Sequence, residues 1–166
     1  IPLEELTAAD EALRCADVAI AWNVFQHFYP YFDVVGVDWD AVLTRSLGRA
    51  LDDRTPEDFL LTLRWMTAQL RDGHARVLHP VMKERAGLPI LVDRIAGEVA
   101  IVAVADQEKR AAGPEVGDVV ISIDGVPSLR EFNESMDYVS GSPQWRTNVA
   151  SREFGRGKRG TLAHLV

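Results

Sequence analysis

The sequence has little cysteine and no long apolar run. Its 166 residues contain one cysteine, Cys15, so no disulfide can form within the chain. Because it lies in a helical pattern with no base nearby, Cys15 is predicted to be a small buried apolar residue and not a catalytic thiol. No apolar stretch approaches the ~18–20 residues that a membrane-spanning helix needs, so we expect no membrane span. Gly-x-Ser-x-Gly elbows, phosphate-binding glycine loops and paired-cysteine motifs are also missing.

Positive charge is scarce, above all in the first half of the chain. The chain has 18 Lys and Arg residues and 25 Asp and Glu residues, which gives a net charge of −7. An acidic first half argues against nucleic acid or an anionic membrane as the main partner. One small basic cluster is predicted to be a solvated face; it consists of Arg152, Arg156, Lys158 and Arg159.

Apolar residues are plentiful, at 47% of the chain, which is enough for a packed core. The length allows one ordinary domain or two small ones. The chain begins without methionine and ends in an apolar, strand-like stretch, 161–166. We therefore expect it to be a piece of a longer polypeptide, and the lack of a targeting segment is uninformative.

The first part of the sequence is predicted to be a helical bundle. Its apolar residues follow helical stripes over 7–30, 38–51 and 55–73. Thr7 is predicted to cap the first helix, and Thr55, followed by Pro56, to cap the third, while Gly73 is placed to end it. Residues 1–79 are therefore expected to form a helical domain. Its many aromatic residues are predicted to be core, with an interface to a missing domain as the alternative.

After Gly73 the pattern becomes extended, which predicts an α+β protein. Strands are predicted at 74–79, 88–95, 98–105, 119–123 and 161–166, and helices at 107–112, 129–139 and 144–154. Residues 80–87 are a predicted linker, and 88–166 a second domain. The β-branched run 119–123 suggests a central strand that is buried on both faces.

One segment of this second part resembles a known module. The stretch Ala112-Gly113 followed by Gly117-Asp118-Val119-Val120-Ile121-Ser122-Ile123-Asp124-Gly125 is similar to the central part of bacterial PDZ domains. The resemblance implies a small β-barrel or sandwich with two or three helices. It also implies a groove that binds peptide C-termini. The residues that match such a groove are Gly87, Leu88, Ile90, Val92, Phe132 and Met136. Pro89 departs from the pattern, because it has no N–H to donate.

The order of segments resembles a larger family. An aromatic helix (22–32), an Asp-Trp-Asp step (38–40), the sequence Asp72-Gly73-His74-Ala75 and then a PDZ-like segment are similar to the N-terminal part of the C-terminal-processing and tricorn-core serine peptidases. The resemblance implies that His74 is a general base for a serine in a following α/β core. A serine precedes this histidine in the tricorn enzyme, whereas Gly73 does here.

The resemblance sets the functional expectation. The chain is expected to be a regulatory and substrate-binding fragment of a serine endopeptidase, inactive alone because it lacks the nucleophile. Its expected partners are peptide or protein C-termini and the missing peptidase core, and relatives of this kind are commonly exported. No cofactor is expected, and His74 and His79 have the wrong spacing to share a metal. The alternative is a non-catalytic PDZ module that binds peptides or serves as a scaffold.

Overall fold

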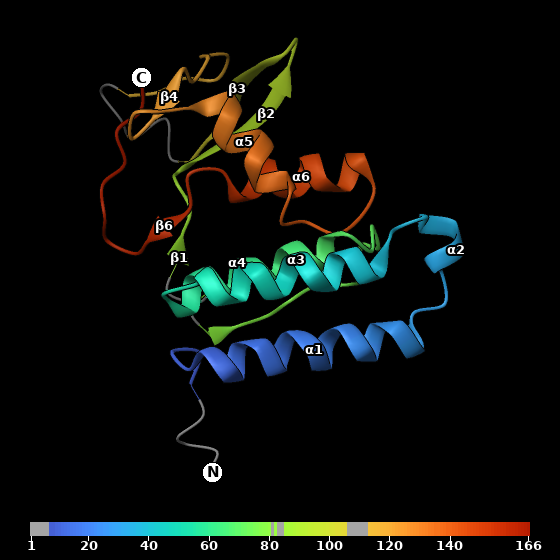
Figure 1. Ribbon diagram of the computed structural model, residues 1–166. Helices are drawn as coiled ribbons and strands as arrows, with labels where there is room; N and C mark the ends of the chain where they lie inside the picture. Colours follow the sequence, from blue (N-terminus) through green and yellow to red (C-terminus); the bar gives the residue numbers. More distant parts are fainter. Residues whose placement is uncertain (1–6, 81, 83–84, 106–112) are drawn as a thin grey trace.

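The structure, a computed structural model, describes residues 7–80, 82, 85–105 and 113–166 (Figure 1). Helices and small antiparallel sheets are both present, so the α+β class is confirmed. None of the described helices has the length and apolar character needed to cross a bilayer. Buried apolar residues form two separate clusters, one in the helical first part and one in the mixed second part.

The first cluster lies among α1 (Glu11–Phe28), α3 (Trp39–Asp52) and α4 (Pro56–Ala68), with the short α2 (Phe32–Val35) beyond the end of α1 (Figure 1). Helix α1 packs against α3, and α3 against α4. The buried apolar residues of this cluster are Val18, Trp39, Val42, Ala50, Phe59, Met66 and Leu70.

The helix boundaries follow their caps. At the start of α4, Thr55 Oγ1 accepts from Asp58 N at 3.1 Å and Asp58 Oδ2 accepts from Thr55 N at 3.0 Å, which confirms the predicted cap. The cap of α1 is Asp10 rather than Thr7, because the Asp10 carboxylate accepts from Ala12 N and Leu13 N.

The predicted end of α4 at Gly73 was wrong. The helix ends at Ala68, and the chain leaves it through Arg71, which has a φ of +53°.

The second part is built on the hairpin of β2 (Ile90–Ile95) and β3 (Glu98–Val104), whose turn at Ala96 and Gly97 is confirmed. Strand β4 (Ser122–Ile123) pairs with β5 (Val126–Pro127), and β1 (Arg85–Ala86) pairs with β6 (Gly157–Lys158). Helices α5 (Ser128–Met136) and α6 (Pro143–Glu153) complete this part. The buried cluster consists of Val92, Val99, Ile101, Val120, Ile123, Phe132, Ala150 and Phe154.

Several predicted strands are shorter or missing. Within 119–123 only Ser122 and Ile123 join a ladder, and Val119 (43% exposed) and Ile121 (61% exposed) face away from the core, so this segment is buried on one face only. The stretch 74–79 is a turn followed by extended chain that joins none of the described sheets.

The other differences are smaller. Residues 161–166 make one bridge, between Leu165 and Ile123, and part of the predicted linker forms β1. The described strands form three two-stranded sheets and not a closed barrel. The predicted helix 107–112 lies outside the described residues.

Gly155 holds the chain close to the second cluster and provides a test of its packing. Its φ is +63°, and a Cβ there would overlap Leu88 Cδ1 and lie 2.8 Å from Ile123 Cδ1. Gly160 has a φ of +85°, and a Cβ there would meet nothing within 4 Å. Replacing Gly160 by alanine therefore measures only the cost of a positive φ for a residue with a side chain. We expect Gly155→Ala to lower the free energy of unfolding by about 1–3 kcal/mol more than Gly160→Ala does, measured by urea denaturation. Equal losses would contradict this packing.

Candidate functional site

His74 lies in the turn that follows α4, beside a carboxylate. Its Nδ1 is 3.0 Å from Asp72 Oδ1, and its backbone N–H donates to the same oxygen at 2.9 Å. The imidazole is otherwise in solvent, with a fully exposed side chain. An ionised carboxylate only accepts, so Nδ1 donates and the lone pair of the neutral ring is left on Nε2, where it can take a proton.

Asp72 is held in its charged form. The pKa of its carboxyl is lowered, mainly by the hydrogen bond from the His74 backbone N–H and further by the contact with the imidazole, while partial burial works in the opposite direction. The carboxylate is thus an acceptor near neutral pH. The structure therefore places an exposed imidazole against a carboxylate, an arrangement that is compatible with activation of a nucleophile.

Contacts from both parts of the chain fix this turn. The Asp72 backbone N–H donates to Ser140 Oγ at 2.9 Å, and the Tyr29 hydroxyl donates to the carbonyl oxygen of Leu70 at 3.0 Å. Ser140 is buried, and it lies between α5 and α6. Arg71 adds a strained backbone position, since a left-handed conformation costs a non-glycine residue about 1–2 kcal/mol. The strained position and both anchors lie within residues 70–72, directly before the candidate base.

The ring of Trp145, from α6, lies against Gly73 of this turn and Gly141 of the segment between α5 and α6. A Cβ on Gly141 would be 2.5 Å from Trp145 Cδ1, and one on Gly73 would be 3.6 Å from the same atom. The sequence did not single out Ser140, Gly141 or Trp145. Their only signal was a Gly-Ser-Pro break before a helix, which says nothing about contact with a turn far away in the chain.

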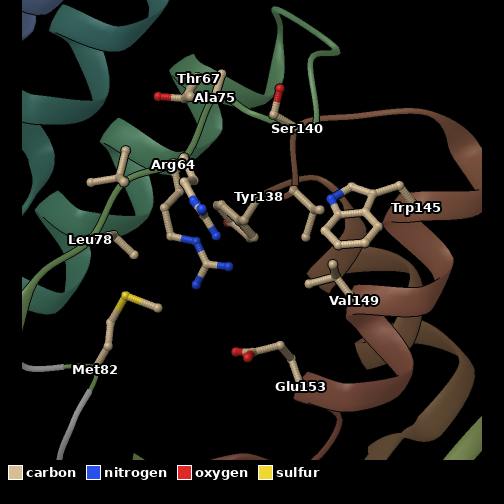
Figure 2. A pocket seen from close by; sticks show the side chains of 14 residues that line it. Arg64, Thr67, Ala75, Leu78, Met82, Tyr138, Ser140, Trp145, Val149 and Glu153 are labelled. Atoms are coloured by element: carbon tan, nitrogen blue, oxygen red, sulfur yellow. The ribbon is translucent and has the colours of Figure 1, made fainter.

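A cavity of about 220 Å³ lies beside the turn (Figure 2). The side chains from α6, Trp145, Val149 and Glu153, lie on one side, with Leu78 and Met82 on the other. Its full lining is Arg64, Thr67, Gly73, Ala75, Arg76, Val77, Leu78, Met82, Tyr138, Val139, Ser140, Trp145, Val149 and Glu153. Gly73 and Ala75, the neighbours of His74, are part of this wall.

The residues predicted to bind peptides gather around the second cluster, where α6 lies against them. Val92 and Phe132 are buried in that cluster, and Leu88, Ile90 and Met136 pack against it. Gly87 lies nearby, on a second cavity between β1 and β6.

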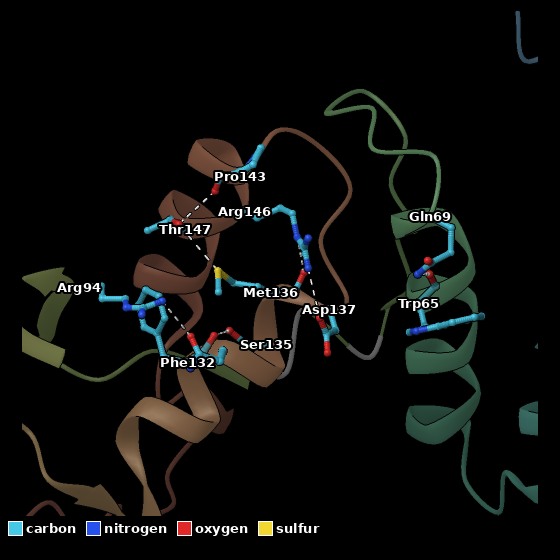
Figure 3. A network of polar contacts seen from close by, with 11 residues as sticks. Trp65, Gln69, Arg94, Phe132, Ser135, Met136, Asp137, Pro143, Arg146 and Thr147 are labelled. Atoms are coloured by element: carbon cyan, nitrogen blue, oxygen red, sulfur yellow. Dashed lines mark hydrogen bonds and ion pairs between the residues drawn. The ribbon is translucent and has the colours of Figure 1, made fainter. Parts of the chain in front are cut away.

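Helix α6 contacts both β2 and α5, the two predicted walls of the groove. Arg146 Nε donates to the Met136 carbonyl at 2.8 Å, and Ser151 Oγ donates to Asp93 Oδ1 at 3.3 Å; Figure 3 shows the Arg146 contact. Peptide binding there stays a prediction, and it requires α6 to move.

Metal binding finds no support in the described part of the chain, where no group of three or more His, Cys, Asp or Glu side chains is placed to hold an ion.

No protein-family model and no curated protein matches the chain. Solved structures do match it. The mature form of CPAF, a chlamydial serine protease, aligns over 87% of this chain and 28% of its own, with a TM-score of 0.66 and 17% identity. The fold is that of part of CPAF.

Two further CPAF structures agree. Mature CPAF complexed with lactacystin gives a TM-score of 0.68 at 17% identity, again over 87% of this chain and 28% of CPAF. A serine-to-alanine mutant of CPAF gives 0.66 at 17% identity, over 92% and 30%. The chain therefore spans less than a third of CPAF, and identity this low shows a shared fold alone.

The cause of the Asp72 pKa shift can be tested. His74→Ala removes the imidazole and keeps the backbone N–H, so we expect the pKa of Asp72, followed by carboxyl NMR, to rise only partly and stay below 3.8. A return to 3.8 in this variant would contradict the dominant role of the backbone. Because the folded-state pKa is lowered, the stabilisation by Asp72 is present above pH 3.8 and is lost as the pH falls through the folded-state value. Asp72→Asn should lack this pH-dependent part of the unfolding free energy.

Proposed function

We propose that this chain is the non-nucleophilic part of a serine protease, and that it supplies His74 as the general base to a serine-bearing core. The observation that carries the proposal is the exposed imidazole whose Nδ1 is held by Asp72. The shared fold with part of CPAF supports a protease-related chain. The finer assignment, to the C-terminal-processing and tricorn-like peptidases with a PDZ-like domain, rests on the resemblance of the sequence.

The chemistry assigned to His74 follows from its two nitrogens. A serine hydroxyl is a weak nucleophile until a base takes its proton. In the proposed enzyme, Nε2 of His74 removes that proton as the serine oxygen attacks the peptide carbonyl, and it returns the proton to the leaving amine. Asp72 stabilises the imidazolium that forms in between. The serine and the donors to the tetrahedral oxyanion belong to the core.

Exposed apolar side chains support docking of such a core near the turn. Phe28 is 80% exposed at the end of α1, and Tyr31 and Val34 are exposed just after it. Their neighbour Tyr29 bonds to Leu70, two residues before Asp72. Exposed apolar groups that lie close together are typical of interaction surfaces. We propose that this surface, at the junction of α1 and α2, faces the core.

The test is His74→Ala in the full-length protein that carries the core. We expect peptide hydrolysis to fall by about a thousandfold or more, because the serine loses its base. Thermal unfolding should hardly change, since the side chain is fully exposed. His164→Ala, which removes another exposed histidine and keeps the backbone hydrogen bond of that residue to Asp124, is the matched control and should keep full activity. Native-like turnover in His74→Ala would reject the assignment.

The second candidate function is a peptide-binding module that uses the predicted PDZ-like groove. It is favoured by α6, which contacts both predicted walls of the groove and contributes one buried residue, Ala150, while Trp145 and Val149 are partly exposed. Displacing such a helix exposes little apolar surface that was fully buried.

A locked variant tests this mode of binding. Asp93→Cys with Ser151→Cys, in a Cys15→Ser background, can link α6 to β2 through a disulfide. We expect peptides with free C-termini to bind the reduced form at micromolar concentration and the oxidised form at least tenfold more weakly. Equal binding by the two forms would place the peptide elsewhere, and no binding by the reduced form at millimolar peptide would reject the module.

A further inference from the structure

The cavity beside the His74 turn contains an arginine without a counter-ion. Among the described residues, no hydrogen bond or ion pair to the Arg64 guanidinium is present. Burial lowers the pKa of Arg64, and the nearby charge of Glu153 only partly offsets this effect. A partly buried cation that has lost solvation and lacks a partner gains more from an anion than an exposed one does.

The charge around Arg64 favours an anion. Glu153 is the acidic residue of the lining, and its Oε1 already accepts from Arg156 Nη1 at 2.6 Å. Arg76 also lines the cavity, and Arg85 is close enough to affect the pKa of Arg64. A neighbouring cavity that shares Arg64 contains Glu131 and Glu134 together with Arg85, so acidic groups approach from that side without forming an ion pair with Arg64. The charged residues that line the cavity itself, Arg64, Arg76 and Glu153, carry a net positive charge.

The other walls are apolar and aromatic. Leu78, Met82 and Val149 face the space, and the indole of Trp145 lies so close to Gly141 that a Cβ there would be 2.5 Å from Trp145 Cδ1. At about 220 Å³ the cavity is smaller than the roughly 300–1,000 Å³ of drug-sized ligand sites. The cavity therefore has room for a single apolar group with an attached charged group, and not for an extended peptide.

We propose that this cavity binds a carboxylate attached to an apolar group, with Arg64 paired to the carboxylate and Trp145 packed against the apolar part. The guanidinium offers two parallel donors to a carboxylate, which gives both affinity and orientation. The two sources of this chemistry in a peptide are the C-terminal carboxylate and an acidic side chain. The inference rests on the cavity and not on the proposed function.

The test titrates the chain with N-acetyl-L-leucine, its amide N-acetyl-L-leucinamide, and the α-amide of N-acetyl-L-glutamic acid. The readout is the indole N–H signal of Trp145 in a ¹⁵N spectrum, assigned with Trp145→Phe. We expect at least one of the two acids to shift this signal at millimolar concentration. If N-acetyl-L-leucine binds, its amide should bind at least tenfold more weakly. The acid that binds more tightly identifies the source of the carboxylate.

Variants decide whether Arg64 is responsible. Arg64→Gln should weaken acid binding at least tenfold, and Arg64→Lys, which keeps the charge, should restore part of it. Arg54→Gln removes an exposed arginine near the start of α4 and should bind like the native chain. His74→Ala should bind the acid as the native chain does. The cavity proposal can therefore hold even if His74 turns out not to be a catalytic base. Any one of three results would overturn the proposal: no shift of the signal by either acid, equal binding of the leucine acid and its amide, or native-like binding by a folded Arg64→Gln variant.

Discussion

The close approach of Trp145, itself 46% exposed, to Gly73 and Gly141 is the constraint on which the His74 turn depends. A side chain at Gly141 would overlap the indole, and the φ of +134° there already disfavours any other residue. Beside this contact, Ser140 accepts from the Asp72 backbone N–H. The turn that carries His74 is therefore held by α6 and the segment before it, and not by its own helix alone. The position of the candidate base depends on packing between residues some 70 apart in sequence.

The same turn combines rigidity with exposure, two properties that a base for an external nucleophile needs together. The imidazole is in solvent, yet one carboxylate oxygen fixes both its Nδ1 and the backbone N–H of its residue. Asp72 in turn is fixed by its own backbone bond to Ser140. Because these anchors act on the backbone and on Nδ1, Nε2 stays free. A histidine buried among apolar neighbours would be as rigid but could not reach a serine outside the chain.

Local signals in the sequence predicted the long helices and the β2–β3 hairpin, while tertiary contacts decided the other strands. The Thr55 cap and the Ala96-Gly97 turn depend on neighbours in sequence, so their patterns sufficed. The end of α4 did not follow its glycine, because Arg71 takes the left-handed position ahead of Gly73. Over 119–123 the burial alternates, with Val120 and Ile123 buried in the core and Val119 and Ile121 exposed, so the apolar run alone did not reveal its exposed face. The motif was enough to single out His74 as a candidate, whereas the contacts of Ser140, Trp145 and Arg64 are ones that no short pattern encodes.

Helix α6 contacts each of the candidate sites. It lies against β2 and α5, the walls of the predicted groove, supplies Trp145 to the His74 turn, and lines the Arg64 cavity with Val149 and Glu153. If a carboxylate binds the cavity as proposed, and only while α6 is in place, it stabilises that position of α6. If a peptide enters the predicted groove, it displaces the helix and loosens both the cavity and the contact with Gly73. Under these two proposals the sites are linked, and occupancy of either one weakens binding at the other to the same extent in both directions. The position of His74 would then depend on which of the two is filled, because the Trp145 contact is shared.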